Sequence, residues 1–215
     1  MRTLILGGLL ALPVTAQDNS WRKEIDNNLV RVVRRLVAPR ETVSAAGLPP
    51  ALLVFLADYS VRLTTAAQQE ELRGNPDQFF WHSGGRIVLE NLSEHRLEVV
   101  QVAPKFSPGS QELAAALGRR TMVFENDLIH VRHLHLAPGR IAASPLAPEH
   151  LLPAVVIQLS SAHIRLTHAG GRIEEFRMKT GDIRFEAGGG FSFENLGDSV
   201  DVLRIILKPG ERDRN

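Results

Sequence analysis

Cysteine is absent from this chain of 215 residues, and tyrosine and tryptophan are scarce, at one and two copies. Without cysteine there are no disulfides and no thiolate chemistry, so the fold must rest on its hydrophobic core. A lectin-like surface needs exposed aromatic platforms and is therefore the least favoured function. The sequence also lacks a phosphate-binding loop, a dinucleotide-binding fingerprint, zinc-type Cys/His spacing and a glycine-flanked serine elbow, so it offers no standard enzyme motif.

Net charge is also small. The 25 basic and 24 acidic residues nearly cancel, and no run of five or six like charges occurs. The sequence therefore predicts no nucleic-acid partner and no attraction to an anionic membrane. Beyond the N-terminus, no apolar run approaches the roughly 18 residues of a membrane span.

The first 16 residues have the pattern of a secretory signal peptide. Arg2 supplies the positive start, residues 4–12 form an uncharged run, and Val14-Thr15-Ala16 places small residues at a cleavage site. We expect cleavage after Ala16 and export to the periplasm or the cell exterior.

A pattern of about a hundred residues occurs twice in the chain. Asn27-Asn28-Leu29 reappears 99 positions later as Asn126-Asp127-Leu128, and Glu90-Asn91-Leu92 reappears 104 positions later as Glu194-Asn195-Leu196. Arg62 likewise returns as Arg165, and both are interpreted as solvated or salt-bridged strand positions. Landmarks that recur in one order indicate a duplicated structural unit.

Within each unit, alternating and β-branched segments bounded by Gly and Pro predict many short strands, and hence an all-β sandwich or barrel. One helix is predicted, from Pro108 to Leu117, with Ser107 as its N-cap and Gly118 beyond its end. The expected organisation is a signal peptide at 1–16, an N-terminal domain at 17–105, a linker with the short helix at 106–120, a C-terminal domain at 121–209 and a polar tail at 210–215.

The order of motifs in the second unit resembles that of a cupin domain. It runs through Ala137-Pro138-Gly139, a loop to Pro148-Glu149-His150, the apolar run 154–159, the turn Gly181-Asp182-Ile183 and Phe193-Glu194-Asn195. The first unit is similar but more divergent, so the chain resembles a bicupin. This resemblance implies two tandem jelly-roll barrels, also called double-stranded β-helices.

The resemblance also implies where a metal would lie, and those positions lack ligands. Metal-binding cupins use two histidines and a glutamate from the first motif and a histidine from the second. Here Pro148 and His150 fall at the first two positions, the strand 154–157 has no glutamate, and Phe191 replaces the last histidine. We therefore expect no cofactor at the usual site. The matching positions of the first unit also lack donors: Gly47, 52–56 and Ile87.

A second histidine pair provides an alternative. His133 and His135 lie two apart on a predicted strand, on the same face as Ile129 and Val131. If that face points into the second barrel, the pair would meet His150 and hold a divalent transition metal. A metal-dependent dioxygenase, isomerase or lyase would follow, although His-x-His pairs in strands are more often simply hydrogen bonded.

The sequence thus favours an exported, metal-free bicupin that binds a small molecule or has a structural role, as a monomer or homodimer. The aromatic stretch 79–81 lines a cavity or an inter-barrel contact, and the first barrel mainly supports the second. The expected ligand-binding residues of the second barrel are His133, His135, His150, Phe191, Val131, Val155 and Ile157.

Overall fold

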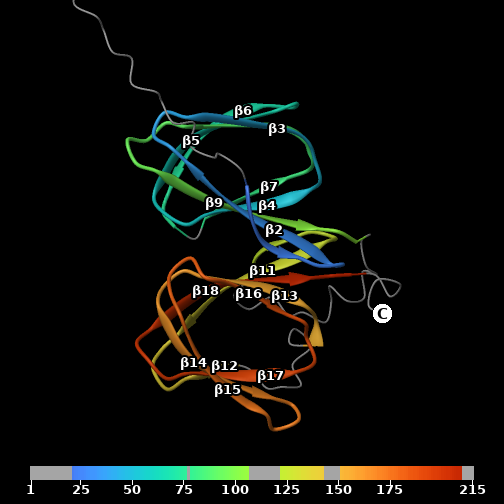
Figure 1. The fold of residues 1–215 in the computed structure, drawn as a ribbon, viewed down its shortest axis with the longest axis vertical. Coiled ribbons are helices and arrows are strands. Elements are labelled where there is room, and N and C mark those ends of the chain that lie inside the picture. Colours follow the sequence, from blue (N-terminus) through green and yellow to red (C-terminus); the bar gives the residue numbers. More distant parts are fainter. Residues whose placement is uncertain (1–20, 77, 107–121, 143–150, 210–215) are drawn as a thin grey trace, which may run out of the picture.

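A computed structural model describes residues 21–76, 78–106, 122–142 and 151–209. Its elements in these ranges are β-strands that form two barrels, one above the other along the long axis of the molecule (Figure 1). The all-β class is therefore confirmed. The predicted signal peptide, the helix from Pro108 to Leu117 and the tail 210–215 lie outside the described residues.

Within the described residues each barrel has nine strands, and the two sets occur in the same order. The first barrel comprises β1 (Arg22–Asp26), β2 (Val30–Val37), β3 (Thr42–Leu48), β4 (Ala51–Phe55), β5 (Tyr59–Thr65), β6 (Gln69–Gly74), β7 (Phe79–His82), β8 (Gly85–Asn91) and β9 (Leu97–Pro104). The second comprises β10 (Met122–Glu125), β11 (Ile129–Leu136), β12 (Ile141–Ala142), β13 (Ala154–Gln158), β14 (Ala162–His168), β15 (Ile173–Met178), β16 (Ile183–Glu186), β17 (Phe191–Asn195) and β18 (Val200–Leu207).

Four antiparallel sheets are stacked along the molecule. In the first barrel, a five-stranded sheet of order β1-β2-β9-β4-β7 faces a four-stranded sheet of order β3-β8-β5-β6. In the second barrel, the corresponding orders are β10-β11-β18-β13-β16 and β12-β17-β14-β15. The identical topology is what a duplicated sequence predicts.

The repeated polar landmarks hold turns and strands together. Asn27 Oδ1 accepts hydrogen bonds from the backbone N–H groups of Leu29 and Val30, both at 2.9 Å, and Asn126 does the same in the second unit. Asn195 is fully buried, and its Nδ2 donates to the Leu136 carbonyl at 2.9 Å. Buried carbonyls need such partners, which explains why these side chains recur.

Arg62 and Arg165 form salt bridges, as expected. Arg62 contacts Glu71 and Glu90, both at 2.6 Å, and Arg165 contacts the equivalent Glu175 at 2.8 Å and Glu194 at 3.0 Å. Each arginine thus joins three neighbouring strands on the outer face of a four-stranded sheet.

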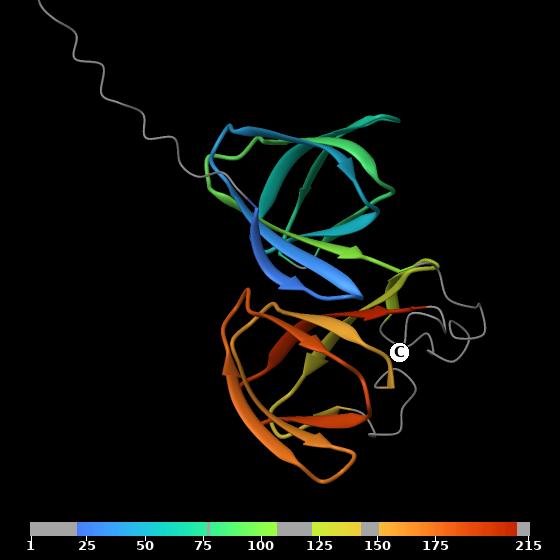
Figure 2. The same ribbon diagram turned by 45° about the vertical axis from the view of Figure 1, so that its right-hand side comes forward.

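The two five-stranded sheets pack against each other and form a core between the barrels (Figure 2). Val32, Val100, Val131, Leu203 and Ile205 are fully buried there. Apolar area that leaves water is worth about 25 cal/mol per Å². Because fully buried side chains of both sheets share this core, we expect the two barrels to be stabilised as one unit.

Polar and aromatic groups extend this contact. Arg34 of β2 donates to the carbonyl of Gly181 in the second barrel, and its Nε lies 2.8 Å from Glu24. Phe79 and Trp81 pack against Phe124, with ring centroids 5.8 and 5.9 Å apart. The aromatic stretch 79–81 therefore contributes to the inter-barrel contact through these two rings.

Candidate functional site

The face of β11 that carries His133 and His135 does not point into the second barrel. Ile129 and Val131, on the same face, are fully buried in the core between the barrels. The expectation that this face lines the second barrel is therefore wrong. β11 lies between two apolar layers, so the apolar character of one face does not identify the barrel interior.

His133 and His135 meet Asp201 on the neighbouring strand β18. His135 Nδ1 lies 2.9 Å from Asp201 Oδ1, and His133 Nε2 lies 3.5 Å from the same oxygen. His150 lies outside the described residues, so a three-histidine site remains a prediction. Within the described ranges, no group of three histidine, aspartate or glutamate side chains is arranged to hold a metal ion.

The other expected ligand-binding residues divide between two cores. Val155 and Ile157 of β13 are fully buried between the barrels and not in the second barrel. Phe191 of β17 is 3% exposed and packs in the core of the second barrel. Side chains alternate along a strand, so the face of β13 that points into the second barrel carries Val156 and Gln158 instead.

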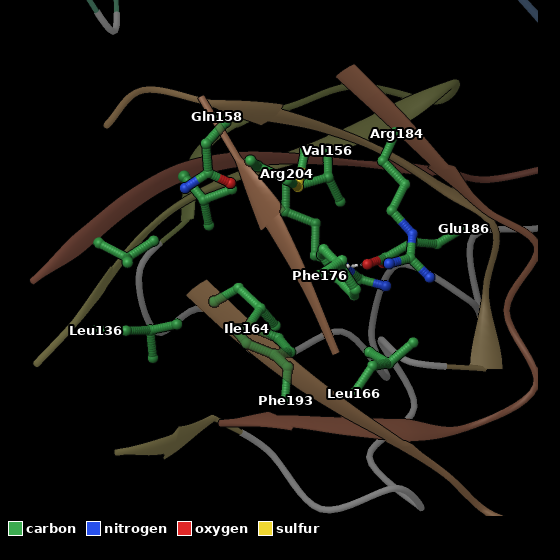
Figure 3. A pocket seen from close by; sticks show the side chains of 13 residues that line it. Leu136, Val156, Gln158, Ile164, Leu166, Phe176, Arg184, Glu186, Phe193 and Arg204 are labelled. Atoms are coloured by element: carbon green, nitrogen blue, oxygen red, sulfur yellow. Dashed lines mark hydrogen bonds and ion pairs between the residues drawn. The ribbon is translucent and has the colours of Figure 1, made fainter. Parts of the chain in front are cut away.

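The second barrel contains a small cavity of about 30 Å³ that opens to solvent on one side (Figure 3). Most of the wall is apolar, with side chains from both sheets. Its lining includes Leu136, Val156, Ile164, Leu166, Phe176, Met178, Phe193, Val200 and Val202. Gln158, Arg184, Glu186 and Arg204 add polar groups, and the two arginines lie on the same side of the cavity in Figure 3.

Arg204 and Glu186 form a buried ion pair in this wall. The Arg204 side chain is 2% exposed, the Glu186 side chain is 10% exposed, and Nε and Oε2 are 3.1 Å apart. The Arg204 guanidinium carbon also lies 5.6 Å from the centroid of the Phe191 ring. A buried charge needs such a partner, and the ion pair holds both charged side chains in place in the wall of the cavity.

Arg184 is held more loosely. Its guanidinium carbon lies 4.3 Å from the centroid of the Phe176 ring, and its Nη2 lies 3.6 Å from Oε2 of Glu174. With 28% of the side chain exposed, Arg184 lies at the rim of the cavity. Arg184 and Phe176 also line an open cleft whose opposite wall includes Arg22 and Arg34 of the first barrel.

The matching positions in the first barrel are filled differently. Strand pairing places Phe80 opposite Leu53 as Arg184 lies opposite Val156, and Phe55 opposite Val99 as Gln158 lies opposite Val202. Phe55 stacks on Tyr59, with ring centroids 4.1 Å apart. Large rings thus occupy the space that the second barrel leaves open.

The buried ion pair is also specific to the second barrel. The pairing that places Arg204 opposite Val156 places Gln101 opposite Leu53 in the first barrel. By the same registers, Glu186 corresponds to His82. A sign of Arg204 existed in the sequence, because it is the one basic residue within the apolar run 202–207. Its role depends on which face of β18 points inward.

No protein-family model matches the sequence, and no curated protein matches it either. Solved structures do match. A cupin 2 conserved barrel domain protein from Leptotrichia buccalis superposes with a TM-score of 0.58 at 10% identity, and the match covers 88% of each chain. The chain has the cupin fold.

Two further cupin-fold structures show the range of proteins that share it. A salicylate 1,2-dioxygenase from Pseudaminobacter salicylatoxidans has a TM-score of 0.60 at 8% identity, with 88% of this chain and 76% of that chain covered. An 11S globulin from Wrightia tinctoria has a TM-score of 0.58 at 6% identity, with 84% and 76% covered. Cupin-fold neighbours therefore include both enzymes and binding or storage proteins.

Two buried histidines in the cupin barrels make stability depend on pH. Burial lowers the pKa of His82, 2% exposed, and of His130, 1% exposed. The unfolded chain then binds protons more readily than the folded one. The two neutral histidines therefore contribute fully to the free energy of unfolding above the unfolded pKa of about 6.5, and this contribution is lost as the pH falls through the lowered pKa. We expect the free energy of unfolding, from urea titrations, to decrease between pH 7 and pH 5.5.

A variant that combines His82→Gln with His130→Gln should show a smaller decrease over the same pH range. An unchanged slope would assign the pH dependence to other groups. His95→Gln, at an exposed position, serves as the matched control and should leave the slope as in the original protein.

Proposed function

We propose that this protein is an exported small-molecule-binding bicupin whose ligand binds at the mouth of the cavity in the second barrel. The observation that carries the proposal is the contrast between matching positions of the two barrels: Phe80 and Phe55 occupy them in the first, whereas Arg184 and Gln158, together with the Arg204–Glu186 pair, line a cavity in the second. Ligand sites are concave, mostly apolar and supplied with a few placed polar groups. The lining of this cavity fits that description, and the open cleft of about 500 Å³ that Phe176 and Arg184 also line supplies the room for a ligand.

The charges favour an anionic ligand with an apolar body. The cavity lining contains two arginines and one glutamate, so its formal charge is +1. Arg204 is engaged by Glu186, whereas the ion pair of Arg184 with Glu174 is long, at 3.6 Å. A guanidinium presents parallel N–H donors that match a carboxylate, so Arg184 is proposed to bind the anionic group.

Named ligands of the structural neighbours suggest probes. Structures of the salicylate 1,2-dioxygenase contain gentisate, an aromatic carboxylate, and the 11S globulin has an auxin-binding site. Fold likeness does not transfer these ligands, since one fold supports many functions. Gentisate and benzoate nevertheless have the apolar ring and carboxylate that the cavity favours.

Isothermal titration with benzoate and gentisate tests the proposal. We expect saturable binding of at least one probe, and Arg184→Met should weaken it by about tenfold, because a charge-assisted hydrogen bond is worth about 1.5–3 kcal/mol. Arg177→Met is the matched control, since Arg177 lies exposed on β15 beside Phe176. Absence of binding, or equal weakening by both variants, would contradict the proposal.

The alternative function, a metal-dependent cupin enzyme, is separated from this one by metal analysis. Native mass spectrometry of freshly purified protein would report a bound transition metal at one equivalent if the enzyme alternative holds. Loss of that metal in His133→Ala, together with His150→Ala, would assign it to the relocated histidines. We propose that no such metal is found.

A further inference from the structure

The core between the barrels ends differently at its two edges. At the edge between β7 and β10, the rings of Phe79 and Trp81 pack against Phe124. At the opposite edge, between β1 and β16, strand pairing places Ile183 at the position of Phe79 and Ile25 at the position of Phe124. The open cleft of about 500 Å³ lies beside this second edge, and its volume is in the range of about 300–1,000 Å³ that small-molecule sites occupy.

Charges of both signs line this cleft. The first barrel contributes Arg22, Glu24 and Arg34, and the second contributes Glu174, Asp182 and Arg184. Three cations and three anions give a formal charge of zero. Electrostatic complementarity therefore favours a ligand that carries a cation beside its carboxylate over a ligand with a carboxylate alone.

The charges on the first-barrel side already neutralise one another. Nη2 of Arg22 lies 2.6 Å and Nε of Arg34 lies 2.8 Å from Oε1 of Glu24. Arg34 also forms an ion pair with Glu98 and donates to the backbone carbonyl of Gly181. A ligand at these arginines would compete with existing pairs, so this side forms a wall of the cleft and does not supply its recognition groups.

Arg184 and Asp182 on the other wall are less engaged. Nη2 of Arg184 lies 3.6 Å from Glu174, which has a closer partner in Arg172, at 2.8 Å. Oδ2 of Asp182 accepts a hydrogen bond from the backbone N–H of Lys179 at 2.7 Å. Within the described residues, no basic side chain forms an ion pair with Asp182. One cation and one anion are thus available to a ligand.

These two groups are close together on the chain. Asp182 directly precedes β16, and Arg184 is the second residue of that strand. Residues two apart in an extended chain are separated by roughly 6.6 Å and project to the same side. An α-amino acid carries its ammonium and carboxylate groups on one carbon atom, so it can contact both side chains at once. Phe176 and Met178 of β15 supply apolar surface in the same cleft.

We propose that the ligand of this site is an α-amino acid with a large apolar side chain. Its carboxylate accepts hydrogen bonds from Arg184, its ammonium group donates to Asp182, and its side chain packs against Phe176 and Met178. This ligand class rests on the proposed function, because Arg184 remains the carboxylate-binding residue. Asp182 adds a site for a cation, so the ligand is a zwitterion and not a simple anion.

Two ligands with the same carbon skeleton test the proposal by isothermal titration of the full chain. L-phenylalanine carries the ammonium group, and 3-phenylpropanoate lacks it. We expect L-phenylalanine to bind about fivefold more tightly, which is the upper range for an ion pair that stays partly exposed to water. Asp182→Asn should weaken L-phenylalanine binding by about the same factor and leave 3-phenylpropanoate binding unchanged. The amide oxygen of this variant can still accept the Lys179 N–H, so the turn is kept.

Asp198→Asn is the matched control, because Asp198 lies exposed between β17 and β18 and does not line the cleft. It should leave both affinities unchanged, and thermal melts followed by circular dichroism confirm that each variant is folded. If 3-phenylpropanoate binds as tightly as L-phenylalanine and Asp182→Asn affects neither, the cation site at Asp182 is overturned, whereas the proposed anion site stands. Absence of binding by both ligands would overturn the cation site and the proposed function together.

Discussion

Replacing Glu186 by leucine is expected to destabilise the protein by about 3–5 kcal/mol, the usual cost of removing one partner of a buried ion pair. Arg204 would keep its charge in a site where its side chain is 2% exposed, while its carboxylate partner at 3.1 Å would be gone. Urea unfolding followed by circular dichroism measures the difference.

The first barrel supplies the control for this prediction. In the first barrel, His82 and Gln101 occupy the positions of Glu186 and Arg204. The double variant Glu186→His with Arg204→Gln therefore gives the second barrel the pair of side chains that the first barrel already contains. It should be considerably more stable than Glu186→Leu, because no charge remains buried without its partner. A cost below about 1 kcal/mol for Glu186→Leu would show that the pair is exposed to water in solution.

Truncating Leu203 to alanine is the second change with a large expected effect. Leu203 is fully buried in the core between the two barrels, and a buried leucine-to-alanine change costs about 2.7–5 kcal/mol. Since residues of both five-stranded sheets share this core, the loss should appear in both barrels at once. Unfolding in urea should therefore remain a single transition, with its midpoint at a lower urea concentration.

Leu36→Ala provides the comparison at an exposed site. Leu36 is 46% exposed on β2, so its truncation should change stability by no more than about 0.5 kcal/mol. Two resolved transitions in Leu203→Ala, with one at the original midpoint, would show that the barrels unfold independently and would contradict the coupling.

Much of the cupin fold could be predicted because duplication and strand chemistry are local properties of the sequence. The offset of 99 between Asn27 and Asn126 marks equivalent turns, and these side chains cap the start of β2 and β11 in the same way. The salt-bridged role of Arg62 and Arg165 also followed from their recurrence.

The interior of the barrels could not be predicted in the same way. Strands β11, β13 and β18 are covered on both faces, so Val155 and Val156 are both buried although they contact different cores. Period-2 alternation identifies a strand but not which of its two buried faces lines a cavity. For this reason the sequence placed Val131, Val155 and Ile157 in the second barrel.

The polar residues of the cavity were missed for a related reason. Arg184, Glu186 and Arg204 come from two strands that are separated in sequence and both pair with β13. The order of strands in the sheet brings these side chains together. A single sequence does not show which strands pair or in which register.

Joining both barrels in one polypeptide lets each acquire substitutions without the other. In a symmetric dimer of identical subunits, a mutation appears at both copies of a position, so an arginine like Arg204 would enter both interiors. Here Gln101 stands in the first barrel at the position where Arg204 pairs with Glu186 in the second. Duplication within one chain thus permits the interiors of the two barrels to differ in charge while their strand order stays the same.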